Sequence, residues 1–153
     1  MRPEYKDYIN KIHVRLRQGE QGYQPDPNYM NQQRQISPNT RKILIDWLIH
    51  LQTFMRLLPE TLFITVNLID RFLSKSILPA EKYLQLVGSA AMLIACKFHE
   101  INPPTLSDFE QCMDRAFTGP EILATECQIL TVLQFDLNFT APSVFLENYS
   151  RAI

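Results

Sequence analysis

The fold is decided by the stretch Leu84-Gln-Leu-Val-Gly-Ser-Ala-Ala-Met-Leu-Ile-Ala-Cys-Lys-Phe98, which is apolar on nearly every side of the helix that it predicts. Apart from Gln85 and Ser89, it has no polar residue before Lys97. At roughly 15 residues it is too long for one buried strand and too short to span a bilayer. We therefore expect a central helix whose small residues, such as Gly88, let neighbouring helices approach closely.

Helices are predicted on both sides of this centre because apolar residues recur there at spacings of three and four. Their starts carry capping or proline signals at Ser37-Pro38, Pro59-Glu60, Pro79-Ala-Glu81 and the capping box Thr118-Gly-Pro-Glu121. The expected helices cover residues 4–18, 38–57, 59–73, 79–98, 106–117 and 119–134, and Pro142 opens one more over 143–149.

Residues 20–37 are rich in Gln, Asn, Pro and Gly, so we expect an extended arm that crosses the surface. Gly19 and Gly22 are expected to stop the first helix before this arm. Tyr23, Tyr29, Met30 and Ile36 are its expected anchor points. No alternating strand pattern is long enough to predict a strand, so the predicted class is all-α.

The charge balance gives no reason to expect nucleic acid or an anionic membrane as a partner. The net charge is −1, from 15 basic and 16 acidic residues. The three cysteines are odd in number and lack CxxC spacing, which is typical of reduced core thiols in a cytosolic or nuclear protein. We expect no signal peptide or anchor, because the N-terminus has no apolar segment.

Two charged residues lie on apolar rows of different helices and suggest a buried pair. Arg41 precedes Leu44 and Leu48 on its own face, and Asp70 lies in a row with Val66. Burying either charge alone costs several kcal/mol, whereas a hydrogen-bonded pair offsets most of that cost. We expect Arg41 and Asp70 to meet in a structural ion pair; a catalytic or ligand-binding role is the alternative.

A second pair of charges suggests a surface for a partner protein. Lys97 ends an apolar row of the central helix, where the macrodipole favours a lysine in any case. Glu126 interrupts an apolar row in the middle of a later helix and has no such explanation. A pair of these residues would be able to hydrogen-bond a partner's backbone, although a purely structural pair remains the alternative.

Catalytic and metal-binding motifs are absent from the sequence. There is no GxGxxG, P-loop, GxSxG or HExxH motif. Cys96 and His99 are too few for a zinc site, which needs four ligands or three plus water. We expect neither an enzyme nor a cofactor or metal.

Three segments in order resemble the N-terminal cyclin box of the mitotic A/B type: Thr40-Arg-Lys-Ile-Leu-Ile-Asp-Trp-Leu48, Asn67-Leu-Ile-Asp-Arg-Phe-Leu-Ser74 and Leu84 to Pro104. The resemblance covers about residues 4–149. It implies a five-helix domain around the central helix, with the extra first helix and arm. It also implies a non-catalytic regulatory subunit that binds and activates a cyclin-dependent serine/threonine kinase in G2/M control, in the nucleus and cytoplasm.

The resemblance also implies roles for individual residues. Arg41 and Asp70 fall on the family's internal salt bridge, and Lys97 and Glu126 on the residues that hydrogen-bond the kinase backbone. The residues that it assigns to kinase contact are Tyr8, Ile12, Leu86, Lys97, Phe98 and Glu126.

A substrate-docking patch for Arg-x-Leu peptides of substrates or inhibitors is implied in the same way. Its residues are Ile43, Leu44, Trp47, Leu84 and Gln85. Two neighbouring positions depart from the mitotic pattern, with Thr40 in place of methionine and His50 in place of an acidic residue. The second change removes a charge-assisted contact to the peptide's arginine.

The resemblance divides the chain into three parts. They are a helix and arm over 1–37, a cyclin box over 38–135, and a linker with the start of a possible second box over 136–153. A cyclin-like scaffold for transcription factors or DNA is the alternative function, which the near-zero net charge disfavours. An enzyme would need a nucleophile–base or metal constellation, which the sequence lacks.

Overall fold

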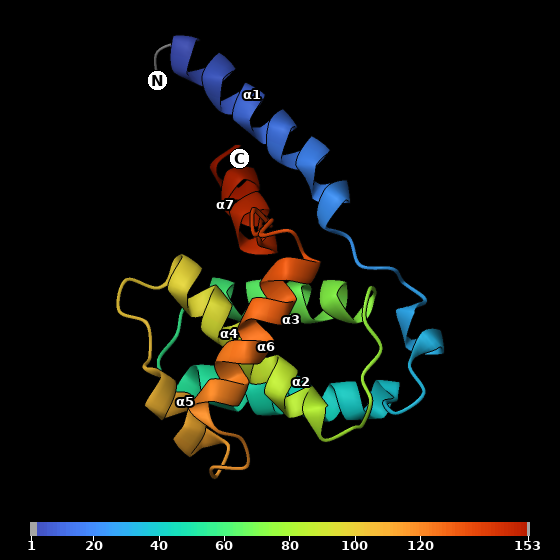
Figure 1. Cartoon of the computed structure of the whole chain (residues 1–153). Helices are drawn as coiled ribbons and strands as arrows, with labels where there is room; N and C mark the ends of the chain where they lie inside the picture. The colour runs from blue at the N-terminus through green and yellow to red at the C-terminus, as the bar shows by residue number, and fades with distance from the viewer. Residues whose placement is uncertain (1–2, 153) are drawn as a thin grey trace.

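The computed structural model describes residues 3–152, and all of the regular secondary structure within them is helical (Figure 1). The helices are α1 (Pro3–Glu20), α2 (Pro38–Phe54), α3 (Pro59–Leu73), α4 (Tyr83–His99), α5 (Leu106–Cys112), α6 (Gly119–Val132) and α7 (Pro142–Ala152). The arm holds two short 3-10 helices, η1 (Gln21–Tyr23) and η2 (Tyr29–Gln32). The predicted all-α class is confirmed.

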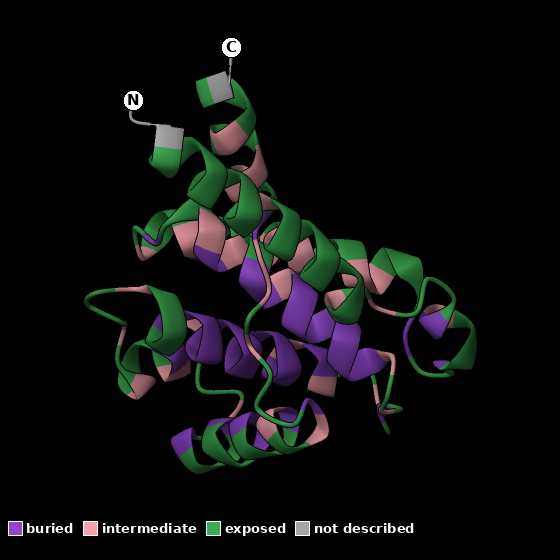
Figure 2. Cartoon of the chain, turned by 90° about the horizontal axis from the view of Figure 1, so that it is seen from above, coloured by how far each residue is buried: buried purple, intermediate pink, exposed green. Residues whose placement is uncertain are grey.

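Helix α4 lies at the centre of the bundle, and every residue from Leu86 to Cys96 is buried. It packs mainly against α3 and α6, and α2 and α5 also contact it. The buried ribbon segments gather on these inner helices (Figure 2). Gly88 leaves room for α2, because a Cβ there would lie 2.8 Å from Cδ1 of Leu44 and would force that side chain to shift. The expected central helix is therefore confirmed.

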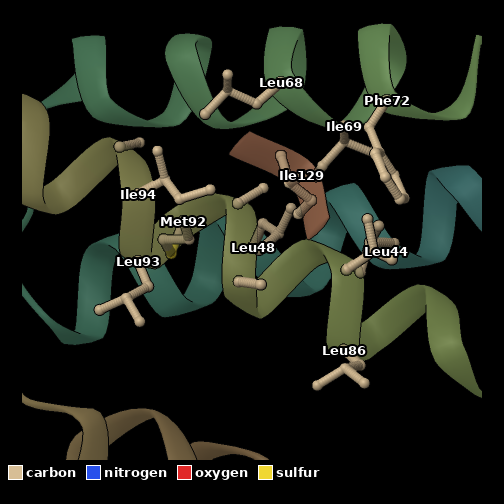
Figure 3. Packing of buried hydrophobic residues seen from close by; sticks show 14 of the residues in the cluster. Leu44, Leu48, Leu68, Ile69, Phe72, Leu86, Met92, Leu93, Ile94 and Ile129 are labelled. Atoms are coloured by element: carbon tan, nitrogen blue, oxygen red, sulfur yellow. The ribbon is translucent and has the colours of Figure 1, made fainter. Parts of the chain in front are cut away.

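Large aliphatic and aromatic side chains from the surrounding helices fill the space around α4. Figure 3 shows Leu48 of α2, Phe72 of α3 and Ile129 of α6 in this core, and all three are fully buried. Removing one such side chain from water stabilises the fold by about 1.5–3 kcal/mol. This core holds α4 and α6 in the fixed relation on which the candidate site depends.

The predicted capping signals set several helix starts. Ser37 and Thr40 form a reciprocal capping box at the start of α2. Thr118 and Glu121 form the expected box at the start of α6, with the Thr118 N–H donating to Glu121 Oε2 at 2.7 Å. Because each box satisfies backbone donors that the helix itself leaves unpaired, these starts depend on local sequence alone.

Helix ends differ more from the predictions, because several residues adopt a left-handed backbone. The helix expected over 106–117 ends at Cys112, since Asp114 and Arg115 have φ values of 51° and 57°. The helix expected to reach residue 57 ends at Phe54, ahead of Arg56 with a φ of 54°. These non-glycine residues carry no obvious sequence signal for that conformation.

Two other boundaries were predicted wrongly. The central helix does not open at Pro79; residues 79–82 form bends and turns, and α4 starts at Tyr83. Gly19 does not stop the first helix, which runs to Glu20 and leads directly into η1. Glycine weakens a helix only by about 1 kcal/mol, so one glycine near an end does not terminate it.

The arm is anchored on the bundle by buried side chains, as Tyr29 and Ile36 were expected to do. A buried polar residue, Gln33, was not predicted. Its Nε2 donates to the backbone oxygens of Leu73 at 2.9 Å and Ser76 at 2.7 Å, and its Oε1 accepts from the Leu78 N–H. Gln33 thereby supplies partners for backbone groups at the end of α3.

Helices α1 and α7 lie beside each other away from the core (Figure 1), where His13 packs edge-on against Phe145 and Tyr149. At the base of α1, Tyr23 donates a hydrogen bond to Asp136 at 2.6 Å and lies under the guanidinium of Arg71. Within residues 3–152, no helix combines the length and the apolar character that crossing a membrane requires.

Candidate functional site

Arg41 of α2 and Asp70 of α3 meet in a two-pronged ion pair. Arg41 Nε donates to Asp70 Oδ1 at 2.9 Å, and Arg41 Nη2 donates to Oδ2 at 2.7 Å. The hydroxyl of Tyr29, from the arm, donates to the same Oδ1 at 2.6 Å. This third donor was missed in the sequence, because only the folded arm brings it to α3.

The surroundings of this cluster keep the Tyr29 phenol and the Arg41 guanidinium protonated. Burial, and then the hydrogen bond to Asp70, raise the pKa of the Tyr29 phenol above its ordinary value. The hydrogen bond to Asp70 also raises the pKa of Arg41. Asp70 is buried and is paired with both Arg41 and Tyr29. The cluster therefore joins the arm, α2 and α3, which is a structural role.

Lys97 and Glu126 form the second ion pair, at the point where the end of α4 crosses α6. Lys97 Nζ lies 2.8 Å from Glu126 Oε1 and 3.1 Å from Oε2. The side chain of Lys97 is 50% exposed, whereas that of Glu126 is only 10% exposed. An ammonium group has three N–H donors, so Lys97 retains a donor for a further acceptor. The pair can therefore bind a backbone while its own geometry stays fixed.

Exposed apolar side chains lie near this pair along the chain. Phe98 follows Lys97 on α4, and Leu123 lies one turn before Glu126 on α6; both are exposed. Ile101, just after α4, is 93% exposed. A hydrogen-bonding charge pair among exposed apolar groups has the composition of a protein-binding surface.

Glu100 holds the end of α4 in place and was not predicted from the sequence. Its Oε1 accepts hydrogen bonds from the Leu58 N–H at 2.6 Å and from the Thr61 hydroxyl at 2.7 Å. The start of α3 has no capping side chain of its own, so Glu100 takes that place from a distant part of the chain. No Ser, Thr, Asp or Asn precedes Pro59 at the start of α3, and this absence is the one sequence signal that would have indicated a distant cap.

The other residues assigned to kinase contact occupy three different settings. Tyr8 and Ile12 are exposed on α1, away from the bundle, and Phe98 is exposed beside Lys97. Leu86 is only 7% exposed and belongs to the core cluster. Leu86 therefore presents little surface to a partner, and its predicted contact remains a prediction.

The residues of the expected docking patch lie together in one surface groove between α2 and the start of α4. The cavity measures about 280 Å³. Leu44 and Leu84 are buried beneath it, Trp47 and Gln85 are half-buried, and Ile43 is 60% exposed. The full lining consists of Thr40, Ile43, Leu44, Trp47, Glu81, Leu84 and Gln85.

The groove has a charge that the sequence reasoning missed. His50, the position expected to depart from the family's pattern, is not part of the lining, and its Nδ1 lies 2.7 Å from the backbone oxygen of Asp46. Glu81, from the turn before α4, does line the groove. Glu81 lies in the turn before α4, outside the three- and four-residue apolar spacing that predicted the helices. That spacing therefore did not place it near α2.

Within residues 3–152, no group of three or more His, Cys, Asp or Glu side chains is placed to hold a metal ion. Among the cysteines, burial raises the pKa of the Cys96 thiol to about 12, and burial also raises the pKa of Cys112. Since the thiolate is the reactive form of cysteine, neither residue is set up as a nucleophile. The features of the described residues that suit binding are the Lys97–Glu126 pair and the groove beside Trp47.

Comparisons with known proteins agree with this geometry. Residues 2–138 match the family described as "Cyclin, N-terminal domain". The chain is 44% identical to the G2/mitotic-specific cyclin cig1 of Schizosaccharomyces pombe, over 95% of this chain and 35% of that protein. It is 42% identical to Cyclin-B2-1 of Oryza sativa subsp. japonica, over 95% of this chain and 34% of that protein. The chain thus spans about a third of the length of these relatives.

The fold is also that of a solved structure, a viral cyclin from herpesvirus saimiri. The TM-score is 0.82 and the sequence identity is 26%, over 91% of this chain and 60% of that one. The family match covers nearly all of the helical bundle, including both ion pairs and the groove. Sequence, fold and relatives agree, and this chain belongs to the cyclin family.

Proposed function

We propose that this chain is a non-catalytic regulatory subunit that binds and activates a cyclin-dependent serine/threonine kinase as a heterodimer. The observation that carries the proposal is the Lys97–Glu126 pair, held by α4 and α6, with exposed apolar side chains next to it along both helices. Relatives named G2/mitotic-specific cyclins support a role in G2/M control of the cell cycle.

Activation by a binding partner requires that it bind the active kinase conformation more tightly than the inactive one. A preformed surface suits that task, because it loses little conformational entropy on binding. Lys97 and Glu126 are already fixed by each other, and Glu100 ties the turn that follows them to α3. The surface therefore favours one geometry of the kinase backbone over others.

The test measures both affinity and activity of a purified, otherwise inactive cyclin-dependent kinase with this chain. We expect Lys97→Ala and Glu126→Ala together to weaken binding by about 2–5 kcal/mol and to abolish activation. Lys75→Ala is the matched control, since Lys75 is an exposed lysine outside any ion pair of the described residues. Unchanged affinity in the double variant would refute the proposed interface.

We propose in addition that the groove beside Trp47 docks linear peptides of substrates or inhibitors, including Arg-x-Leu peptides. An apolar groove with polar groups at its edge supports this second role. Peptide binding that survives Trp47→Ala would contradict it. The peptide groove and the kinase surface involve different residues, so the two proposals can fail separately.

We also propose that the protein acts in the nucleus and cytoplasm. The free thiols of Cys96, Cys112 and Cys127 are consistent with a reducing compartment. A fluorescent fusion expressed in cells tests this location. Signal confined to the secretory pathway would contradict it.

A further inference from the structure

We propose that Tyr23 is a positioning residue, which fixes the base of α1 to α3 and to the segment before α7 and thereby sets the direction in which α1 presents Tyr8 and Ile12 to the kinase. The inference rests on the kinase role proposed above. It goes further because it assigns a task to a residue that belongs to neither of the surfaces expected to contact a partner.

The direction of α1 is not fixed by a hydrophobic interface. No residue from Glu4 to Glu20 is buried, and the main packing of the helix within the described residues is against η1, which follows it directly. A helix of 18 residues is about 27 Å long, so a small rotation at its base moves its far end by several ångströms. The contacts at the base therefore decide where Tyr8 and Ile12 lie.

Tyr23, the last residue of η1, is held through three different groups. Its hydroxyl donates to Asp136 Oδ1 at 2.6 Å, and its backbone oxygen accepts from Asn67 Nδ2 of α3 at 2.8 Å. The guanidinium of Arg71 lies over its ring, with Cζ 5.0 Å from the ring centroid. These contacts, the Tyr23 anchor, fix both the main chain and a side chain three residues after α1 ends.

Arg71 gives the Tyr23 anchor a physical cause. This arginine is buried, and within the described residues it forms no ion pair. Its Nη1 donates to the backbone oxygen of Asp136 at 3.0 Å, and burial lowers the pKa of its guanidinium. Because a buried cation is costly unless it is compensated, the face of the Tyr23 ring and the oxygens of Asp136 are needed to cover it. The hydrogen bond to Asp136 also raises the pKa of the Tyr23 phenol, which therefore keeps its proton at neutral pH.

The Tyr23 anchor also joins α1 to α7. Asp136 lies at the start of the connector that leads from α6 to α7. Farther along α1, His13 packs edge-on against Phe145 and Tyr149 of α7. The two helices are thus joined at their bases through Tyr23 and along their length through His13 (Figure 1). Two separate points of attachment fix the direction of a helix, whereas one alone lets it turn.

A kinase that contacts α1 needs this helix in one direction. When only a fraction of the molecules has that direction, the apparent Kd rises by the inverse of the fraction. Losing one hydrogen bond shifts such an equilibrium by about two- to tenfold. We expect Tyr23→Phe to raise the Kd for the kinase within this range, and Tyr23→Ala, which also removes the ring beside Arg71, to raise it further.

The first experiment measures the direction of α1 in the free chain, as the distance between two spin labels determined by pulsed electron paramagnetic resonance. One label is attached to the exposed Cys127 of α6, and the other to Asp7→Cys at an exposed position of α1. Cys112→Ala removes the half-buried thiol, and Cys96 is buried and stays unlabelled. The distance distribution should be narrow in this labelled chain and should broaden when Tyr23→Phe is added.

Two further variants separate positioning from a general loss of stability. Tyr29→Phe is the matched control, because it removes a hydroxyl that donates over the same 2.6 Å, to Asp70, elsewhere in the arm. It should leave the distance distribution narrow although Tyr29 is buried. Asp136→Asn keeps an oxygen that accepts from Tyr23 and should also leave it narrow, whereas Asp136→Ala should broaden it. A distribution in Tyr23→Phe as narrow as in its parent would overturn the inference.

The second experiment measures the Kd of the full, unlabelled chain for a purified cyclin-dependent kinase in a double-mutant cycle. In a chain that carries Tyr8→Ala and Ile12→Ala, Tyr23→Phe should cause no further loss of affinity, because α1 then offers no contacts whose direction matters. An equal loss with and without these two substitutions would overturn the inference, since it would indicate a general structural effect of Tyr23.

The two experiments also separate this inference from the proposed function. Kinase binding that tolerates Tyr23→Ala would overturn the inference and leave the proposed function intact. Absence of kinase binding by the unaltered chain would overturn the proposed function and, with it, the effect of Tyr23 on affinity. The distance between the labels, which is measured without the kinase, would still decide whether Tyr23 fixes the direction of α1.

Discussion

Replacing Asp70 by alanine should destabilise the fold strongly, because it removes one acceptor from two buried or half-buried donors. The Arg41 guanidinium loses both of its hydrogen bonds to the carboxylate, and the Tyr29 hydroxyl loses its own. Breaking a buried ion pair from one side costs about 3–5 kcal/mol. The Arg41 side chain is 32% exposed and can regain some water, so we expect the lower end, about 3 kcal/mol.

Thermal and urea denaturation followed by circular dichroism measure this loss. For a domain of this size, 1 kcal/mol corresponds to about 2–4 °C in Tm, so Asp70→Ala should melt roughly 6–12 °C lower. Glu147→Ala is the matched control, because it breaks the exposed ion pair with Arg151 and should change stability by less than about 1 kcal/mol. A Tm for Asp70→Ala within about 2 °C of the unaltered chain would refute the reasoning.

Two further predictions concern groups that the sequence alone did not place. Because the folded-state pKa of Tyr29 lies above its ordinary value of 10.0, the stability that this phenol contributes is fully present below pH 10 and is lost as the pH rises toward the raised pKa. Tyr29→Phe should therefore cost about 1–2 kcal/mol at neutral pH, and its difference from the unaltered chain in urea denaturation should shrink above about pH 10; a constant difference would contradict this. Glu100→Ala should leave the Leu58 N–H and the Thr61 hydroxyl without their acceptor, lower the free energy of unfolding by about 1–2 kcal/mol and speed hydrogen exchange across residues 97–101. Exchange as slow as in the unaltered chain would exclude Glu100 as the group that holds the end of α4.

Helix starts were predicted better than helix ends, for a physical reason. A capping box such as Thr118 with Glu121 satisfies backbone donors within four residues, so it can be read from the chain itself. The ends of α2 and α5 instead depend on non-glycine residues with positive φ, such as Arg56 and Asp114. Such strained conformations persist only where the surrounding packing over-determines them.

Some residues of the candidate site could likewise be predicted from local sequence, and others could not. Apolar periodicity singled out Lys97 and Glu126, because a charge on a buried row of a helix needs a partner. The structure brings the two together at 2.8 Å. Periodicity had no means of finding Glu100, which caps a helix 42 residues away in sequence, or Glu81, which lies in a turn outside any helical row.

The sequence by itself determined the all-α class, the central apolar helix and the two pairs of charges that need each other. These features follow from local spacing, because burial on a helix repeats every three or four residues. Only the tertiary structure decided that Tyr29 joins the Arg41–Asp70 pair and that Glu81 faces the groove beside Trp47. Such contacts join segments that are distant along the chain, and their positions are set by how whole helices pack around α4 rather than by any local pattern.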